Sequence, residues 1–486
     1  MRRFTFFLFL SATVLFGPTA GESQGINGRA RTYVSYLEIR ELVLDSVPAE
    51  SVEGDGVQRS LPDGTSVSCG EIHCEYYRSG PKVSVVPVLQ DVELNVWTGV
   101  TGLRAYAHVR GRTAQGDKKL WPRSEESFEA LSAYVEYTRS FYRIQAGRIW
   151  QTTSLGFYNY DGGSLALRLP KGLNIDIYGG LSLVRGLNQL HHTDLISSVE
   201  SLGPRFDAYR GGIHARWRPS SAFSTAFTYQ REGTRRYHDL YAERVAGSAR
   251  LLLGKATIDG EIKYDLATRT ANLARVNLAT PVGGGLRIGA GLRKYVPFFE
   301  LWTIWGAFSP VGFQEASARL DWMNSSGGVS AHFSGAKRSY AETEADAPSE
   351  YEIRDDAWRV AAGGSVRFGG GFTVAGEYRR DIGFGSSRSG GDLSIQRFFG
   401  RKTYLAIQGT AFETFSEFRV GSGRVVGGGV VAETPIGPAT MRGNAMLYRH
   451  TQSDRPSILD LNQARMSFTL EVPIGGDPGV SGRGSQ

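Results

Sequence analysis

The 486-residue sequence has only two cysteines and eighteen prolines, and past residue 25 it lacks any long apolar run. A membrane-spanning helix needs ~20 consecutive apolar residues, so that class of membrane protein is excluded for this part of the chain. Gly-x-Ser-x-Gly, His-Glu-x-x-His and phosphate-binding glycine loops are also absent, and we therefore expect neither an enzyme nor a cofactor. The net charge of +7 comes from singly spread basic residues. Because they form no stripe, we do not expect nucleic acid as a partner.

The N-terminus has the pattern of a secretory signal. Met1-Arg2-Arg3 is followed by an apolar stretch over residues 4–16, which Gly17-Pro18 ends before it could span a membrane. We predict a signal peptide over residues 1–25, cleaved between residues 20 and 25, and without its two arginines the net charge is about +5. The small residues there offer several sites, and no cysteine follows to suggest a lipoprotein.

The two cysteines, Cys69 and Cys74, lie close together in a long polar connection. Export would bring them into an oxidising compartment. In an exported chain two such thiols are expected to form a disulfide. A metal site that includes His73 is the alternative. The order Cys-x-x-Cys-His is absent, so covalent haem attachment is not supported.

Sixty-two glycines and 11% aromatic residues favour twisted strands joined by tight turns. Residues 103–112 and 256–265 alternate strictly between apolar and polar side chains, as do several other segments. Strand periodicity places these two sets on opposite faces of a sheet. Alternation alone does not show which face of the sheet contacts water, so a water-soluble β-sandwich is still an alternative at this point.

The connections between these segments alternate in length, as in bacterial barrels that have short periplasmic turns and longer external loops. A first strand over residues 31–42 is followed by a long connection to about Pro87, and a last strand covers residues 461–472. Short turns are expected near residues 99–102, 139–140, 170–172, 219–221, 254–255, 281–285, 325–328, 369–371, 400–402 and 436–438. Long connections are expected near residues 115–126, 186–204, 340–355 and 383–391.

The alternation of short and long connections predicts an all-β protein. We expect a transmembrane, antiparallel, up-and-down β-barrel over residues 26–475 with about 22 strands, in the range of 20 to 24. Residues 297–313 are either an aromatic loop or one additional strand. Only about ten residues separate the signal from the first strand, and residues 476–486 form a flexible tail, so we expect no N-terminal plug. The lumen is then narrowed by inward-folded loops, filled by a separate protein, or open.

One local motif resembles a known family. Gly147-Arg148-Ile149-Trp150-Gln151 and, further on, Asp161-Gly162 resemble the Gly-Arg-Gln and Asp-Gly pair that flanks one external loop in many substrate-selective porins and polysaccharide-export barrels. The match covers about seventeen residues and supports the class of bacterial, porin-like outer-membrane β-barrels. It implies that Arg148 and Asp161 position a loop over the pore. The alternative is that they tie two neighbouring strands.

Alternation also predicts which charged side chains face the lumen. The arginines are Arg104, Arg110, Arg143, Arg216, Arg287, Arg293, Arg319, Arg359, Arg367 and Arg379. Guanidinium groups that line a pore would favour anions. However, Glu93, Glu136, Asp176, Asp259, Glu261, Asp321 and Glu377 are expected on the same face, where they would pair with the arginines. The aromatic cluster Phe298, Phe299, Trp302, Trp305 and Phe308 is interpreted as part of a headgroup-level girdle, with a sugar- or partner-binding loop as the alternative.

Three functions fit this barrel in the outer membrane of a Gram-negative bacterium. The first is a porin-like channel for small hydrophilic or anionic solutes. The second is a sheath that holds another protein, such as a multihaem cytochrome, across the membrane. The third is an export or surface-adhesion barrel that uses the long first loop over residues 45–87. The expected partners are outer-membrane lipid, the barrel-assembly machinery and, for the sheath, the protein that fills the lumen.

Overall fold

The computed structural model describes the barrel and most of its connections. The described residues are 25–54, 59–62, 66–116, 127–183, 208–234, 240–296, 312–340, 356–383, 388–400, 402–414, 423–452 and 461–475. Within these ranges, no helix is long and apolar enough to cross a membrane. The predicted signal peptide, tail and aromatic cluster at residues 298–308 lie outside them, and so do most of the predicted long connections.

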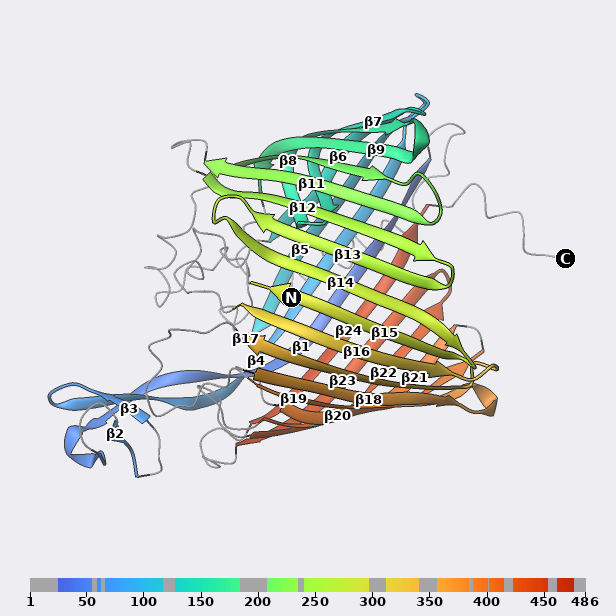
Figure 1. Ribbon diagram of the computed structural model, residues 1–486. Coiled ribbons are helices and arrows are strands. Elements are labelled where there is room, and N and C mark those ends of the chain that lie inside the picture. The colour runs from blue at the N-terminus through green and yellow to red at the C-terminus, as the bar shows by residue number, and fades with distance from the viewer. Residues whose placement is uncertain are drawn as a thin grey trace.

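Long antiparallel strands form one closed wall (Figure 1). The first half of the chain forms β1 (Ile26–Pro48), β2 (Arg59–Ser60), β3 (Ser66–Cys69), β4 (His73–Trp97), β5 (Leu103–Gly116), β6 (Phe128–Thr138), β7 (Tyr142–Thr153), β8 (Gly156–Leu169), β9 (Leu173–Ser182), β10 (Ala208–Trp217), β11 (Phe223–Thr234) and β12 (Leu240–Leu253). The second half forms β13 (Ala256–Asp265), β14 (Thr270–Gly283), β15 (Leu286–Tyr295), β16 (Phe313–Met323), β17 (Val329–Tyr340), β18 (Asp356–Arg367), β19 (Phe372–Ile382), β20 (Arg388–Phe399), β21 (Thr403–Thr414), β22 (Gly423–Ile436), β23 (Ala439–Gln452) and β24 (Leu461–Ile474). Three single 3-10 turns are η1 (Ala49–Ser51), η3 (Pro170–Gly172) and η6 (Gly369–Gly371).

The wall closes because the first and last strands pair with each other. β1 pairs with β24 from Gly28 opposite Ile474 to Leu37 opposite Arg465, and each strand from β4 onward pairs with the next. β2 and β3 stand apart from the wall, so 22 of the 24 strands form the barrel. The predicted fold and strand number are confirmed. No described residue forms a domain inside the barrel that is separate from the wall strands.

The start of the chain departs from the prediction. β1 continues to Pro48 and β4 begins at His73, so much of the segment predicted as a long loop is strand. Pairing with β24 ends at Leu37 and pairing of β4 with β5 ends at Val85, but β1 and β4 continue to pair as far as Pro48 and His73. The two strands therefore leave the wall as a two-stranded arm, with β2 and β3 at its far end (Figure 1).

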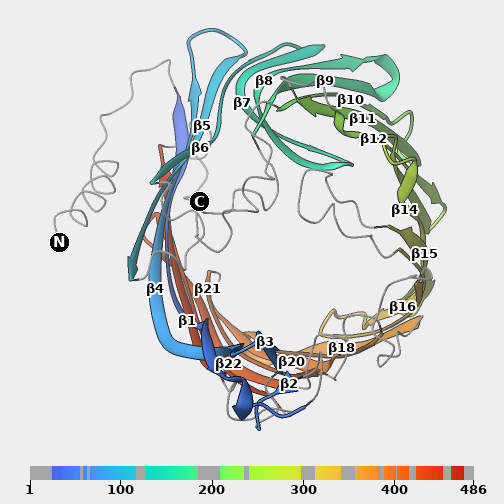
Figure 2. The same cartoon turned by 90° about the vertical axis from the view of Figure 1, so that its left-hand side faces the viewer.

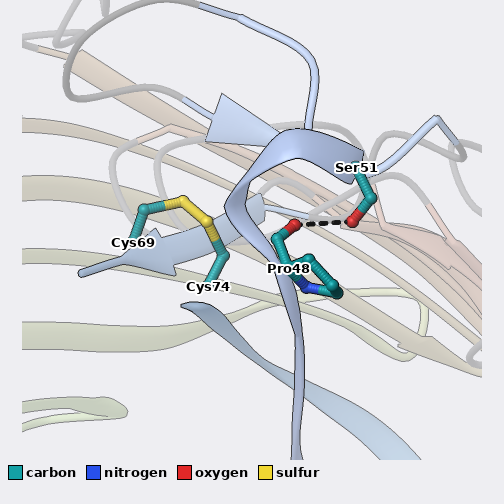
Figure 3. Close-up of a disulfide and its surroundings, with 4 residues drawn as sticks. All are labelled: Pro48, Ser51, Cys69 and Cys74. Carbon is teal, nitrogen blue, oxygen red and sulfur yellow. Dashed lines mark hydrogen bonds between the residues drawn. A yellow bond between two sulfur atoms is a disulfide. The ribbon is translucent and has the colours of Figure 1, made fainter. Parts of the chain in front are cut away.

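The tip of the arm carries the disulfide that was expected from the sequence. Cys69 at the end of β3 pairs in register with Cys74 in β4, and a disulfide joins them (Figure 3). Beside it, the Ser51 hydroxyl donates a 2.7 Å hydrogen bond to the carbonyl oxygen of Pro48. Along the arm, the Arg78 guanidinium donates to the Asp45 carboxylate at 2.5 Å, which lowers the pKa of Asp45.

The predicted short turns all fall at one end of the barrel. Gly254 and Gly437 adopt a φ of 59° in two-residue turns, a left-handed conformation that glycine reaches without strain. The arm extends from the opposite end, which is called here the long-connection end (Figure 1). Residues 297–311 lie outside the described residues, and β16 begins at Phe313.

The two faces of the wall differ in chemistry. Large apolar side chains, such as Leu292, Ile407 and Leu447, are more than half exposed on the outward face. Exposed aromatic residues lie near the short-turn end of this face: Trp217, Trp322, Phe368 and Phe399. A closed barrel with an apolar outer band and an aromatic girdle is the form that β-structure takes in a bilayer. The chain is an outer-membrane β-barrel.

Candidate functional site: the lumen and its inward hairpin

The inward face of the wall carries charged and polar side chains at alternate positions. All ten arginines predicted from alternation lie on this face, and six of them form ion pairs. The pairs and their N–O distances are Arg104–Glu136 2.8 Å, Arg110–Asp91 2.6 Å, Arg143–Asp176 4.0 Å, Arg319–Asp321 2.7 Å, Arg359–Asp381 3.0 Å and Arg379–Glu377 2.7 Å. Pairing removes most of the positive field that isolated guanidinium groups would give. That these arginines line a conducting pore stays a prediction.

The other four arginines, Arg216, Arg287, Arg293 and Arg367, make no ion pair with a described residue. The Arg293 guanidinium lies over two aromatic rings, 4.7 Å from the centroid of Tyr295 and 5.3 Å from that of Phe313. Stacking of this kind holds the cation against the wall without neutralising it. These four arginines leave a modest positive excess among the predicted lumen-facing side chains.

The β7–β8 hairpin leaves the wall and turns into the lumen. Pairing of β6 with β7 ends at Ala133 opposite Arg148, and pairing of β8 with β9 ends at Tyr160 opposite Ser182. Beyond these points, β7 and β8 pair only with each other. Figure 2, which looks into the long-connection end, shows this hairpin inside the ring of strands. Of the three possibilities left by the sequence, the described residues show a lumen narrowed by an inward-folded segment.

Glycines explain where the hairpin bends. Gly162 faces Gly147 on one side and Gly180 on the other, on the lumen side of the wall. A Cβ at Gly162 would lie 2.1 Å from the Gly179 oxygen, and one at Gly180 would lie 2.3 Å from the Asp161 oxygen. At Gly163, which points outward, the nearest atom would be 3.4 Å away. Crowding only on the inner side means that the sheet is concave toward the lumen here, and such a bend requires glycine.

The tip of the hairpin packs against the inner faces of β10, β11 and β12. The Ser154 and Thr228 hydroxyls share a 2.7 Å hydrogen bond, and Tyr158 packs with Leu155 and Ala246 in a buried cluster. Closer to the bend, Tyr160 is fully buried and its ring centroid lies 5.8 Å from that of Tyr178. These contacts hold the tip of the hairpin in a fixed position on one side of the lumen, called here its seat.

A buried ion pair supports this seat. Arg210 in β10 pairs with Glu232 in β11, and both side chains are almost completely buried. The Arg210 guanidinium lies 4.3 Å from the centroid of the Tyr158 ring. Nearby, the Tyr178 hydroxyl donates a 3.0 Å hydrogen bond to Gln230. Removing one member of a buried pair leaves an uncompensated charge, which typically costs ~3–5 kcal/mol.

The Arg148–Asp161 pair lies where the hairpin leaves β6. Arg148 donates to both carboxylate oxygens of Asp161, at 2.8 and 2.9 Å, from the facing position of the β7–β8 ladder. Its third donor, Nη1, bonds the Ala130 carbonyl at 2.9 Å, and Asn159 bonds that of Leu131 at 2.9 Å. These side chains therefore bond carbonyls of β6 beyond the end of its ladder with β7. The pair ties two neighbouring strands, and its role in positioning the hairpin stays a prediction.

The sequence motif at Arg148 and Asp161 predicts only a loop between two strands, so it does not identify the residues that hold the hairpin against the wall. One signal was present. Glycine doublets occur in three consecutive strands, at Gly162-Gly163, Gly179-Gly180 and Gly211-Gly212. The strand register brings these doublets side by side. Among the described residues, no three His, Cys, Asp or Glu side chains are grouped as metal ligands would be.

No family model matches the chain, and no curated protein matches it. Among solved structures, the translocation pore of the P pilus usher PapC has 10% identity and a TM-score of 0.42, over 93% of this chain and 100% of that one. A BenF-like porin from Pseudomonas fluorescens Pf-5 has 9% identity and a TM-score of 0.41, over 94% and 99%. OpdQ from Pseudomonas aeruginosa has 8% identity and a TM-score of 0.41, over 93% and 100%.

Proposed function

We propose that the barrel is a channel for small hydrophilic solutes across the outer membrane, with the β7–β8 hairpin as its constriction. The inward hairpin is the observation that carries this proposal. A barrel of this strand number has a wide lumen, and a folded-in segment with its own buried seat narrows the lumen without closing the wall. The tip is held by Ser154 and Tyr158 against β11 and β12.

The lumen chemistry supports weak selectivity. Six of the ten predicted arginines are paired with carboxylates, so permeating ions meet a nearly balanced surface with a modest positive excess. Such a surface suits hydrophilic solutes in general, with a mild preference for anions. Strong exclusion of cations would require a larger share of unpaired guanidinium groups than these four arginines provide.

Conductance of the purified full-length protein in planar bilayers tests the proposal. Discrete openings with a weak anion preference in the reversal potential are expected. A second measurement addresses the constriction. Because the Ser154 and Thr228 oxygens are 2.7 Å apart, a Ser154→Cys/Thr228→Cys variant should form a disulfide that locks the tip. Locking should reduce fluctuations of the open current, and a reductant should restore them.

The single Ser154→Cys variant, treated with the same reductant, controls for the native disulfide in the arm. A protein that never opens discrete channels contradicts the channel proposal. A partner protein recovered from the lumen under mild detergent would instead favour the sheath. The assembly machinery expected as a partner stays a prediction.

A second function is suggested by the arm. It extends beyond the end of the wall and exposes Leu44 and Ile72, and the disulfide closes its tip (Figure 3). A rigid, projecting element with exposed apolar residues suits contact with a surface or protein outside the barrel. Deleting residues 45–82 should abolish such binding while conductance stays unchanged. Loss of conductance with intact surface binding would contradict this assignment.

A further inference from the structure

The outward face of the barrel carries a groove of about 970 Å³ that crosses the strands from β11 to β17. Ile262, Val276 and Leu292 contribute to its lining, and each of them is more than half exposed. Exposed apolar residues of this size mark the lipid-facing side of the wall. The groove therefore opens toward the membrane.

Two adjacent rows of the sheet register form the groove. In the first, each residue faces the next on the neighbouring strand: Ala249, Gly260, Val276, Leu292, Ala316 and Lys337. The second row is Gly247, Ile262, Ala274, Lys294, Gln314 and Ser339. Small residues in both rows leave room between the larger side chains. The groove thus follows the hydrogen-bonding direction across the tilted strands.

The groove changes from apolar to basic along its length. Its β12–β14 part contains only apolar outward side chains and glycine, whereas Lys294 and Lys337 lie in its β15–β17 part together with Gln314 and Ser339. Lys294 is the residue before the end of β15 at Tyr295, and β17 ends at Tyr340. Both ammonium groups are thus at the long-connection end. Neither makes an ion pair with a described residue, and the Lys337 Nζ lies 5.0 Å from the Trp358 ring centroid.

We propose that this groove binds a phosphorylated, acylated glycolipid of the outer leaflet. An acyl chain fits the apolar part between the small residues, and a headgroup phosphate lies between the two lysines. The long-connection end faces the outer leaflet in bacterial barrels. Ammonium groups at headgroup level attract anionic lipid, and Trp358 lies at the depth where amphipathic rings prefer the interface.

Native mass spectrometry of the full-length barrel with diphosphoryl lipid A tests this site. The wild type should retain lipid A in preference to phosphatidylethanolamine. Lys294→Gln/Lys337→Gln should weaken retention at least about tenfold, since each lysine near a charged surface contributes separately. The control, Lys255→Gln, removes an exposed lysine at the short-turn end and should change nothing.

A second variant tests the apolar part. Ala316→Leu fills the groove, whereas Ala445→Leu adds the same bulk to an exposed outward position on β23. Only Ala316→Leu should weaken lipid A binding. Folding of every variant is checked by heat-modifiable migration in gels. Equal binding by the double lysine variant, or equal retention of phosphatidylethanolamine, overturns the proposal, as does a loss of binding with Ala445→Leu equal to that with Ala316→Leu.

Discussion

The bend of the β7–β8 hairpin should depend on the absence of a side chain at Gly162. A Cβ there would lie 2.1 Å from the Gly179 oxygen, whereas real Cβ contacts essentially never fall under 3.0 Å. Gly162→Ala must therefore move β8 from β9 by at least 0.9 Å. Overpacking of this kind typically costs ~1–3 kcal/mol. Because β8 and β9 are pushed apart on the concave, lumen-facing side of the sheet, the bend at Gly162 opens.

The consequence at the tip can be worked out from strand geometry. A shift of 0.9 Å across strands that are ~4.8 Å apart tilts the hairpin by about 0.19 radian. Over the eight residues from Gly162 to Ser154, at ~3.3 Å per residue, this tilt moves the turn by about 5 Å. That displacement breaks the 2.7 Å hydrogen bond between Ser154 and Thr228 and withdraws Tyr158 from its cluster. The constriction should widen, so the single-channel conductance should rise.

The neighbouring glycine provides a matched control. A Cβ at Gly163 meets its nearest atom, the Gln145 oxygen, at 3.4 Å, so Gly163→Ala should be tolerated. Single-channel conductance and thermal unfolding would be measured for both variants. If Gly162→Ala conducts like the wild type, or if Gly163→Ala raises the conductance equally, glycine does not set the bend.

Three further outcomes are expected. Glu136→Gln removes the carboxylate that neutralises Arg104, so the reversal potential should shift toward anions, and an unchanged potential would show that this pair does not face the permeating ions. Cys69→Ser opens a short covalent loop worth ~2 kcal/mol, so proteolysis of the arm should accelerate while barrel migration in gels stays unchanged. Arg78 lowers the pKa of Asp45, so the stability of the arm from this pair is present above the ordinary pKa and lost as pH falls through the lowered one. Arg78→Gln should raise that pKa in an NMR titration.

The strands of the wall were predictable because the alternation that defines each strand lies within a short stretch of sequence. Each strand must place apolar side chains toward lipid and polar ones toward the lumen, and this alternation is visible in segments such as 103–112 and 256–265. The arm was missed for the opposite reason. Both faces of a two-stranded ribbon meet water, so nothing imposes alternation on the segment from Tyr76 to Pro81. Its strands are visible only once β1 is paired with β4.

The inward course of the β7–β8 hairpin could not be predicted, because it depends on strand register. The glycine doublets are present in the sequence, but their effect comes from Gly162 facing Gly180 across two strands. The same holds for charge pairing. Arg359 and Asp381 are opposite one another in the β18–β19 ladder, although 22 residues separate them in the sequence. Alternation gives the face of a side chain, whereas its partner is fixed only by the ladder.

The lumen charges and the hairpin have different consequences for a permeating solute. The arginine pairs run along the wall: Arg319 bonds Asp321 two residues away on its own strand, and Arg104 bonds its ladder partner Glu136. Such pairs hold the guanidinium groups against the sheet, away from the axis. Among the described residues, the β7–β8 hairpin is the segment that leaves the wall and enters the lumen. Solute size should therefore be limited by the hairpin, and charge preference by the wall. Gly162→Ala should then raise the conductance without shifting the reversal potential. Glu136→Gln should shift the reversal potential toward anions without raising the conductance.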